Sequence, residues 1–128
     1  MFKVRVVAVG KIREPYLRDA IGEYAKRLGR YCTLEVVEVA DEDISAGESA
    51  AQVERHLRAE ADRLAARIWG GAREGRYVAA LDLRGDAPDS VGFAEKLRAI
   101  MGERPEISFV IGGSCGLHTE LLSRANCR

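Results

Sequence analysis

The sequence predicts an α/β fold in which a mostly parallel sheet is covered by helices on both faces. Strand-like and helix-like segments alternate four times along the chain. This alternation is typical of parallel sheets, because parallel neighbours need a crossover connection that is usually a helix. No internal repeat or linker interrupts the pattern. With 128 residues, 47% of them hydrophobic, the chain fits one domain spanning residues 1–128.

The first strand and the first helix are the clearest local signals. Residues 2–9 are rich in valine and end at Gly10, which predicts a strand. Pro15 then opens a helix, because proline suits the first helical position, and Gly29 is placed to end it. The apolar positions of this helix fall on one face: Leu17, Ile21, Tyr24, Ala25 and Leu28.

The second strand and the second helix are separated by an acidic loop. Residues 34–39 alternate apolar and acidic side chains, which predicts a less deeply buried strand. The loop covers residues 41–48, and a long helix over residues 53–68 follows it and ends at Gly70-Gly71. Its apolar positions recur at helical spacing: Val53, Leu57, Ala61, Leu64 and Ile68.

The second half repeats the same order. Residues 77–83 predict the third strand, residues 90–101 a helix, residues 107–111 the fourth strand and residues 117–125 a short final helix. In that final helix two leucines are expected to face the core: Leu121 and Leu122.

The charge distribution is uneven although the net charge is zero. Zero net charge speaks against a strongly basic nucleic-acid binder. Residues 1–30, however, hold eight Lys or Arg against three acidic residues, and residues 35–60 hold eight Asp or Glu against two arginines. The first region could face phosphates while the second repels them, or both could be ordinary solvated surfaces.

Cysteines, histidines and hydropathy exclude several classes. Cys32, Cys115 and Cys127 form no Cys-x-x-Cys pair, and their odd number argues against a disulfide framework. His56 and His118 share no ligand spacing with them, so no metal is expected. No apolar run approaches the roughly 20 residues of a membrane helix, and the amino terminus does not resemble a signal peptide. We therefore expect a cytoplasmic protein without a membrane segment.

Two strand ends are the candidate binding site. The third strand delivers Leu81-Asp82-Leu83-Arg84-Gly85, and the fourth delivers Gly112-Gly113-Ser114-Cys115-Gly116. If these strands are neighbours, their carboxyl ends lie about 5 Å apart, at the edge where open α/β sheets bind ligands. Leu81 and Leu83 would form an apolar wall for an adenine ring, and the glycines would expose main-chain groups. Alternatively, the glycines only turn the chain into the last helix.

The glycine segment matches neither of two familiar nucleotide motifs. No Gly-Lys-Ser/Thr follows it, and no Gly-x-Gly-x-x-Gly follows the first strand. Asp82 could accept hydrogen bonds from a ribose or amino group, or it could be a turn residue paired with Arg84 or with backbone amides. Nucleotide hydrolysis and nicotinamide binding are therefore disfavoured.

Other reactive or aromatic residues have simple structural interpretations beside their chemical ones. His118 could act as a base, or it could cap the last helix. His56 is expected on a solvated face. Cys115 lies near a helix start, but no histidine set stands behind it for covalent catalysis. Trp69 is expected to pack at a helix end.

Six separated segments, taken in order, span essentially the whole chain. They are Val6-Val7-Ala8-Val9-Gly10-Lys11, Pro15-Tyr16, Glu23-Tyr24-Ala25-Lys26-Arg27-Leu28, Glu38-Val39-Ala40-Asp41-Glu42, Ala80-Leu81-Asp82-Leu83-Arg84-Gly85 and Phe109-Val110-Ile111-Gly112-Gly113-Ser114-Cys115-Gly116-Leu117-His118. Together these segments resemble the RlmH family of SPOUT-class rRNA methyltransferases.

The resemblance implies a SPOUT α/β-knot fold, a homodimer and an activity on the ribosome. That activity is transfer of a methyl group from S-adenosyl-L-methionine (SAM) to N3 of a pseudouridine in 23S rRNA. The resemblance also assigns Leu81 and Gly112 to the SAM site, and both coincide with the two strand ends chosen above. It carries over no catalytic residue.

The sequence departs from the family pattern at its end. Family members continue with a segment that threads the knot and completes the SAM pocket, whereas this sequence finishes at Cys127-Arg128. The expectation is therefore a SPOUT domain with the knot-forming part absent and half of the cofactor site present. The alternatives are a truncated or degenerate homologue without catalysis, acting as a weak binding or dimerisation module, and a generic nucleotide-binding domain. In the leading interpretation, rRNA phosphates would contact the basic first helix: Arg13, Arg18, Lys26, Arg27 and Arg30.

Overall fold

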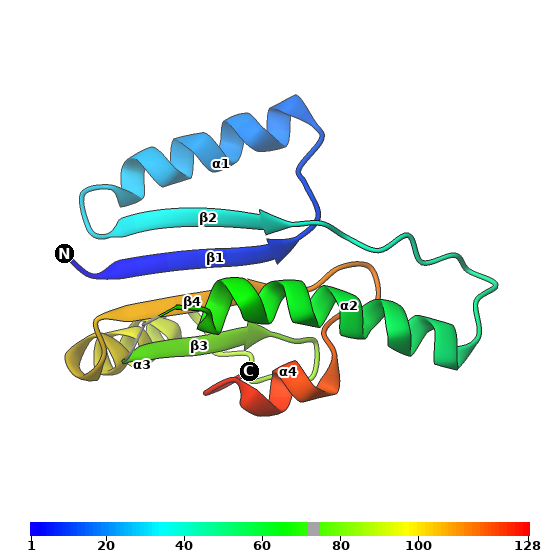
Figure 1. Cartoon of the computed structure of the whole chain (residues 1–128). Helices are drawn as coiled ribbons and strands as arrows, with labels where there is room; N and C mark the ends of the chain where they lie inside the picture. Colours follow the sequence, from blue (N-terminus) through cyan, green and yellow to red (C-terminus); the bar gives the residue numbers. More distant parts are fainter. Residues whose placement is uncertain (72–74) are drawn as a thin grey trace.

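The computed structural model describes residues 1–71 and 75–128, which contain four strands and four helices in strict alternation (Figure 1). The elements are β1 (Lys3–Val9), α1 (Pro15–Leu28), β2 (Thr33–Val39), α2 (Ala50–Trp69), β3 (Arg76–Leu81), α3 (Ser90–Glu103), β4 (Glu106–Ile111) and α4 (Thr119–Arg124). Every predicted element is present, and the boundaries differ by a few residues.

Two boundary differences have local causes. Helix α2 begins three residues before the predicted start because Ser49 and Gln52 form a capping box, each side chain bonding the other residue's backbone N–H. Strand β3 ends at Leu81 and not at residue 83, because the Gly85 N–H donates to the Asp82 carbonyl at 2.9 Å and starts a turn.

All neighbouring strands of the sheet are parallel, in the order β2-β1-β4-β3. The predicted parallel sheet is confirmed. Since parallel strands place their carboxyl ends at one edge, the loops after all four strands gather at the same side of the molecule (Figure 1).

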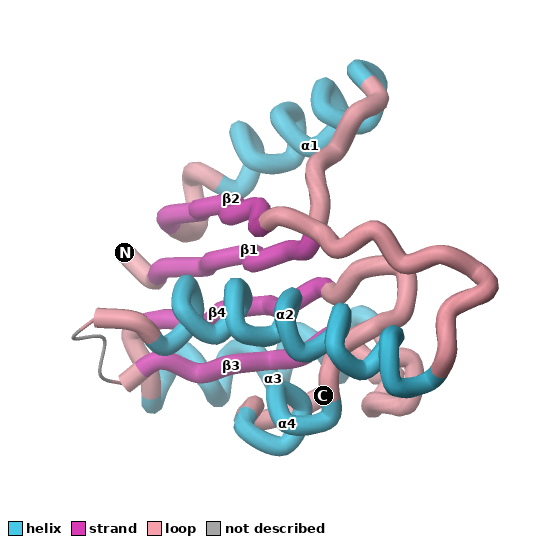
Figure 2. Tube along the Cα trace, turned by 45° about the vertical axis from the view of Figure 1, so that its right-hand side comes forward, coloured by secondary structure: helices cyan, strands magenta, loops and turns pink. Residues whose placement is uncertain are grey.

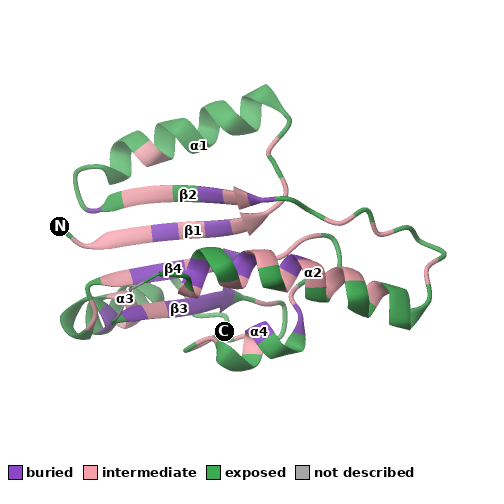
Figure 3. Cartoon of the chain, in the orientation of Figure 1, coloured by how far each residue is buried: buried purple, intermediate pink, exposed green. Residues whose placement is uncertain are grey.

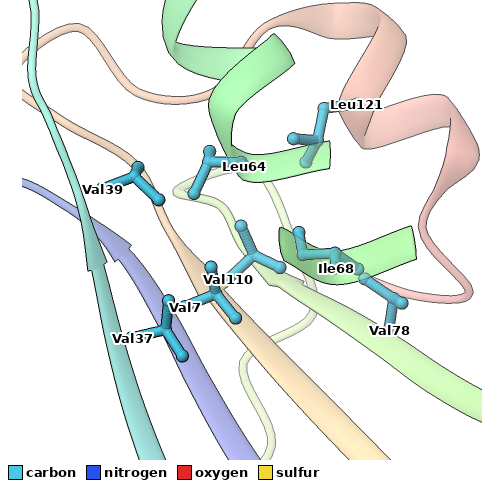
Figure 4. Packing of buried hydrophobic residues seen from close by; sticks show 8 residues of the cluster. All are labelled: Val7, Val37, Val39, Leu64, Ile68, Val78, Val110 and Leu121. Atoms are coloured by element: carbon cyan, nitrogen blue, oxygen red, sulfur yellow. The ribbon is translucent and has the colours of Figure 1, made fainter. Parts of the chain in front are cut away.

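One face of the sheet carries the larger core. Helix α2 crosses in front of the strands, and α4 packs beside it near β3 (Figures 1 and 2). Leu64 and Ile68, one turn apart on α2, are almost completely buried. The whole cluster, seen in Figure 4, consists of Val7, Val37, Val39, Leu64, Ile68, Val78, Val110 and Leu121. Leu121 therefore faces the core as predicted, whereas Leu122 is only half-buried.

The opposite face is covered less evenly. Helix α3 lies behind β3 and β4, where Ile100 packs with Ala79 and Ile107. Helix α1 lies along the outer edge beside β2 and has no buried residue (Figure 3). Cover on both faces is thus confirmed, but the predicted apolar face of α1 stays largely exposed.

The residues after α4 run alongside β3. The Asn126 side-chain oxygen accepts from the Val78 N–H at 2.7 Å, and the Ala80 N–H donates to the Cys127 carbonyl at 2.9 Å. Ala79 and Cys127 form a parallel bridge. The pKa of Tyr77 is raised to about 12. The larger cause is the hydrogen bond between Tyr77 and the Cys127 thiol, and the smaller cause is burial of the phenol. These contacts hold the last residues against the free edge of β3.

Candidate functional site

The two predicted strand ends lie side by side. Strands β3 and β4 are hydrogen-bonded neighbours, and Leu81 stands opposite Ile111 in their register. Gly112 follows Ile111 directly, so Leu81 and Gly112 border the same place at the carboxyl edge of the sheet. The Leu81 side chain is about half exposed there. The adjacency on which the candidate site depends is confirmed.

The glycine segment folds into a tight turn. The Gly116 N–H donates to the Gly113 carbonyl at 3.1 Å, and Gly116 has a φ of 80°, which favours glycine. A Cβ on Gly112 would lie 2.6 Å from the Gly116 carbonyl carbon and oxygen. The segment therefore turns the chain, as the alternative interpretation proposes, and the turn itself fills the space beside Gly112. Ser114, Cys115 and Gly116 are exposed at this strand edge.

A buried carboxylate that the sequence analysis missed supports this turn from behind. Glu60 on α2 is 3% exposed, and its two oxygens lie 3.2 and 3.3 Å from the position of a Cβ on Gly113. Glu60 Oε2 accepts from the Glu42 N–H at 2.9 Å, which connects α2 to the acidic loop. The sequence did contain one sign that Glu60 is buried. It is an acidic residue on the apolar face of α2, next to Ala61 and one turn from Leu64.

An apolar cleft of about 100 Å³ lies beneath this edge, between α3 and the strands β3 and β4. Its apolar lining includes Ala79, Leu81, Phe93, Leu97, Ile107 and Phe109. Leu83 takes no part in the lining and is fully exposed in the turn after β3. The predicted wall of Leu81 and Leu83 is thus wrong for Leu83, because the strand ends at Leu81.

Asp82 is a turn residue with an unexpected partner. Its carboxylate Oδ2 lies 3.6 Å from Arg128 Nη1, and its carbonyl accepts from Gly85. The turn interpretation is confirmed, but the paired arginine is Arg128 and not Arg84.

His118 is a helix cap. Its Nδ1 accepts from the Glu120 N–H at 3.1 Å, at the start of α4, and its Nε2 lies 2.7 Å from Glu54 Oε1. The hydrogen bond from His118 is the main cause that lowers the pKa of Glu54. Both ring nitrogens are engaged, so the capping interpretation is confirmed. Cys115 is exposed near the turn, and the nearest partner of its sulfur is the Ser114 hydroxyl at 4.0 Å.

His56 departs from the prediction of a solvated face. Its Nδ1 lies 3.1 Å from Glu42 Oε1 and its Nε2 lies 3.0 Å from Glu48 Oε2, so the ring is held between two carboxylates of the acidic loop. The hydrogen bond to Glu42 is the main cause that raises the pKa of His56. The sequence spacing did not show this contact, because the loop folds back onto α2.

The remaining candidates have structural roles. Trp69 packs against the larger core, and the Arg124 guanidinium lies 4.0 Å above its ring. Within residues 1–71 and 75–128, no cluster of three His, Cys, Asp or Glu side chains could hold a metal ion. None of the helices in the described part combines the length and apolar character needed to cross a membrane.

Comparison with known proteins defines the class. The model of a family described as "Predicted SPOUT methyltransferase" matches residues 2–128, in agreement with the four-stranded parallel sheet. The chain is 41% identical to the ribosomal RNA large subunit methyltransferase H of Ruminiclostridium cellulolyticum, covering 98% of this chain and 77% of the relative. For the same enzyme of Acetivibrio thermocellus the identity is 39%, covering 97% and 76%, and for that of Ligilactobacillus salivarius it is 40%, covering 98% and 77%. The chain belongs to the RlmH family of SPOUT methyltransferases.

Proposed function

We propose that this chain binds SAM at the carboxyl edge of β3 and β4 and methylates N3 of a pseudouridine in 23S rRNA. The relatives are methyltransferases of large-subunit ribosomal RNA by name, and a SPOUT methyltransferase implies SAM as the methyl donor. The observation that carries the proposal is the adjacency of Leu81 and Gly112 at one strand edge. A ribosomal substrate in turn implies a cytoplasmic location.

The residues at this edge fit the donor. Leu81 offers an apolar surface to the adenine ring, and the exposed residues Ser114, Cys115 and Gly116 of the turn after β4 lie at the same edge of the sheet. When bound, SAM supplies an electrophilic methyl group on its sulfonium. The chain contributes chiefly by positioning, because holding two reactants in line removes most of the entropic cost of their encounter. The described residues assign no general base, since both nitrogens of the nearby His118 are engaged.

Calorimetric titration with SAM tests the proposal. Leu81→Ala is expected to weaken SAM binding about fivefold, because roughly 1 kcal/mol of apolar contact is lost. Leu83→Ala is the matched control: Leu83 lies two residues away, is fully exposed and is expected to leave the affinity unchanged. Absence of SAM binding by the unmodified chain would instead support the non-catalytic alternative. Equal loss of affinity in the two variants would show that SAM does not bind against Leu81.

We propose further that the protein is a homodimer in which a second copy covers the apolar stripe of α1 and leaves its charged face free. Leu17, Ile21 and Leu28 recur on one face of this helix, yet each is about 40% exposed. A surface helix normally buries such a stripe, and a second copy offers the same stripe in return. Light scattering is expected to give a dimer mass, and Ile21→Glu is expected to give a monomer with unchanged circular dichroism. A monomeric unmodified chain would contradict the proposal.

A further inference from the structure

The carboxyl end of α1 and the turn after it form a surface depression of about 430 Å³, which we call the basic cradle. Its lining residues are Glu23, Lys26, Arg27, Arg30 and Tyr31. The cradle therefore gathers three cationic side chains and one carboxylate around an open hollow.

Two of the cationic groups are left without a neutralising partner. Arg27 Nε lies 3.1 Å from Glu23 Oε1, so the charges of these two side chains neutralise each other within the cradle. Lys26 and Arg30 form no ion pair with any residue in the described part of the chain. Some basic groups elsewhere are neutralised, as Arg58 is by two carboxylates and Arg63 by Glu42, so unpaired charge is not general to the surface of the described chain. It is shared, however, by single arginines such as Arg55 and Arg98. The cradle carries a local surplus of two positive charges on a chain of zero net charge.

An exposed aromatic ring stands beside these charges. The Tyr31 side chain, which lines the cradle, is 73% exposed. Cations that track a phosphate backbone, combined with aromatic faces on which bases stack, are the pattern of single-stranded nucleic-acid binding. An acidic peptide would use the charges but gain nothing comparable from the Tyr31 ring.

The basic cradle is separate from the candidate donor site. It lies at the amino end of β2, whereas Leu81 and Gly112 lie at the carboxyl edge of the sheet (Figure 1). A strand of seven residues spans about 20 Å between these two edges. An RNA strand contacting both places would therefore meet the cradle several nucleotides away from the methylated base.

We propose that the basic cradle binds the phosphodiester backbone of rRNA that flanks the methylated nucleotide. Lys26 and Arg30 each contact a phosphate, and Tyr31 stacks on a base. The choice of RNA as the partner rests on the proposed function, while the cradle itself rests on charge and exposure. Neither contact takes part in methyl transfer.

Fluorescence anisotropy with a twelve-nucleotide oligouridine RNA, measured over a range of salt concentrations, tests the proposal. The Lys26→Gln/Arg30→Gln double variant is expected to bind about tenfold more weakly at low salt. It is also expected to reduce the magnitude of the slope of log affinity against log salt by about 1.4, because each of the two lost phosphate contacts contributes roughly 0.7 to that slope. The matched control is Arg55→Gln/Arg98→Gln, which removes the same charge from two exposed arginines on α2 and α3 that form no ion pair with residues 1–71 or 75–128. The control is expected to keep the slope of the unmodified chain.

Tyr31 supplies a second, independent readout. Tyr31→Ala is expected to weaken RNA binding at least about fivefold without changing the salt slope, because stacking releases no counterions, and Tyr31→Phe is expected to retain binding. The proposal is overturned if the unmodified chain does not bind the RNA, if the control pair lowers the slope equally, or if polyaspartate displaces the RNA at equal charge concentration. Loss of SAM binding with these RNA results intact would refute the proposed donor site and leave the cradle standing.

Discussion

Replacing Gly112 by alanine is expected to lower the free energy of unfolding by about 3 kcal/mol and to abolish SAM binding. The added Cβ would lie 2.6 Å from the Gly116 carbonyl and 3.0 Å from Leu117 Cγ. Backbone atoms cannot yield as a flexible side chain can, so the turn must open, at the upper end of the usual cost of overpacking. Urea unfolding followed by circular dichroism measures the first effect, and calorimetry the second.

Gly22→Ala is the control for this substitution. Gly22 lies inside α1, and a Cβ there would meet nothing within 4 Å. Alanine is favoured over glycine in a helix interior, so this variant is expected to gain up to about 1 kcal/mol. If Gly112→Ala proved as stable as the unmodified chain and bound SAM normally, the close turn would have no part in forming the donor site.

Replacing Arg5 by methionine is expected to cost about 3 kcal/mol of stability. The Arg5 side chain is 1% exposed, donates to the Arg67 carbonyl at 2.9 Å and lies 3.3 Å from Glu35 and 3.8 Å from Glu106. Its removal leaves the mostly buried Glu106 carboxylate poorly compensated, and breaking a buried pair from one side typically costs 3–5 kcal/mol. The lower end is expected here because Lys3 lies 4.0 Å from Glu106.

Two further variants distinguish the loss of stability caused by the buried charge from the loss caused by packing. Arg5→Met/Glu106→Met removes both charges and is expected to recover most of the lost stability in urea unfolding. Arg27→Met breaks an exposed pair on α1 and is expected to cost less than about 1 kcal/mol. If the double variant were as unstable as Arg5→Met alone, the loss would come from packing and from the Arg67 carbonyl, and the electrostatic account would be wrong.

The sequence predicted the two strand ends of the candidate site but not the side chains that surround them. Leu81 and Gly112 could be chosen because each ends a strand-like segment, and glycines expose main-chain atoms. Glu60 and His56 were missed or misplaced because their partners, Gly113 in one case and Glu42 and Glu48 in the other, come from loops whose path the local pattern does not describe. The assignment of SAM to Leu81 and Gly112 remains a prediction that calorimetry will test.

The spacing of apolar residues, together with proline and glycine positions, was enough to locate every helix and strand that the structure describes. These signals act over a few residues, so a short stretch of sequence contains them. The partners of each strand depended on contacts between distant residues: β1 pairs with β4 about a hundred residues later, and this inserts β4 between β1 and β3. The exposed face of α1 has the same origin, because an amphipathic pattern marks which side is apolar and not what covers it. Long-range packing, which no local window contains, determined the shape of the site.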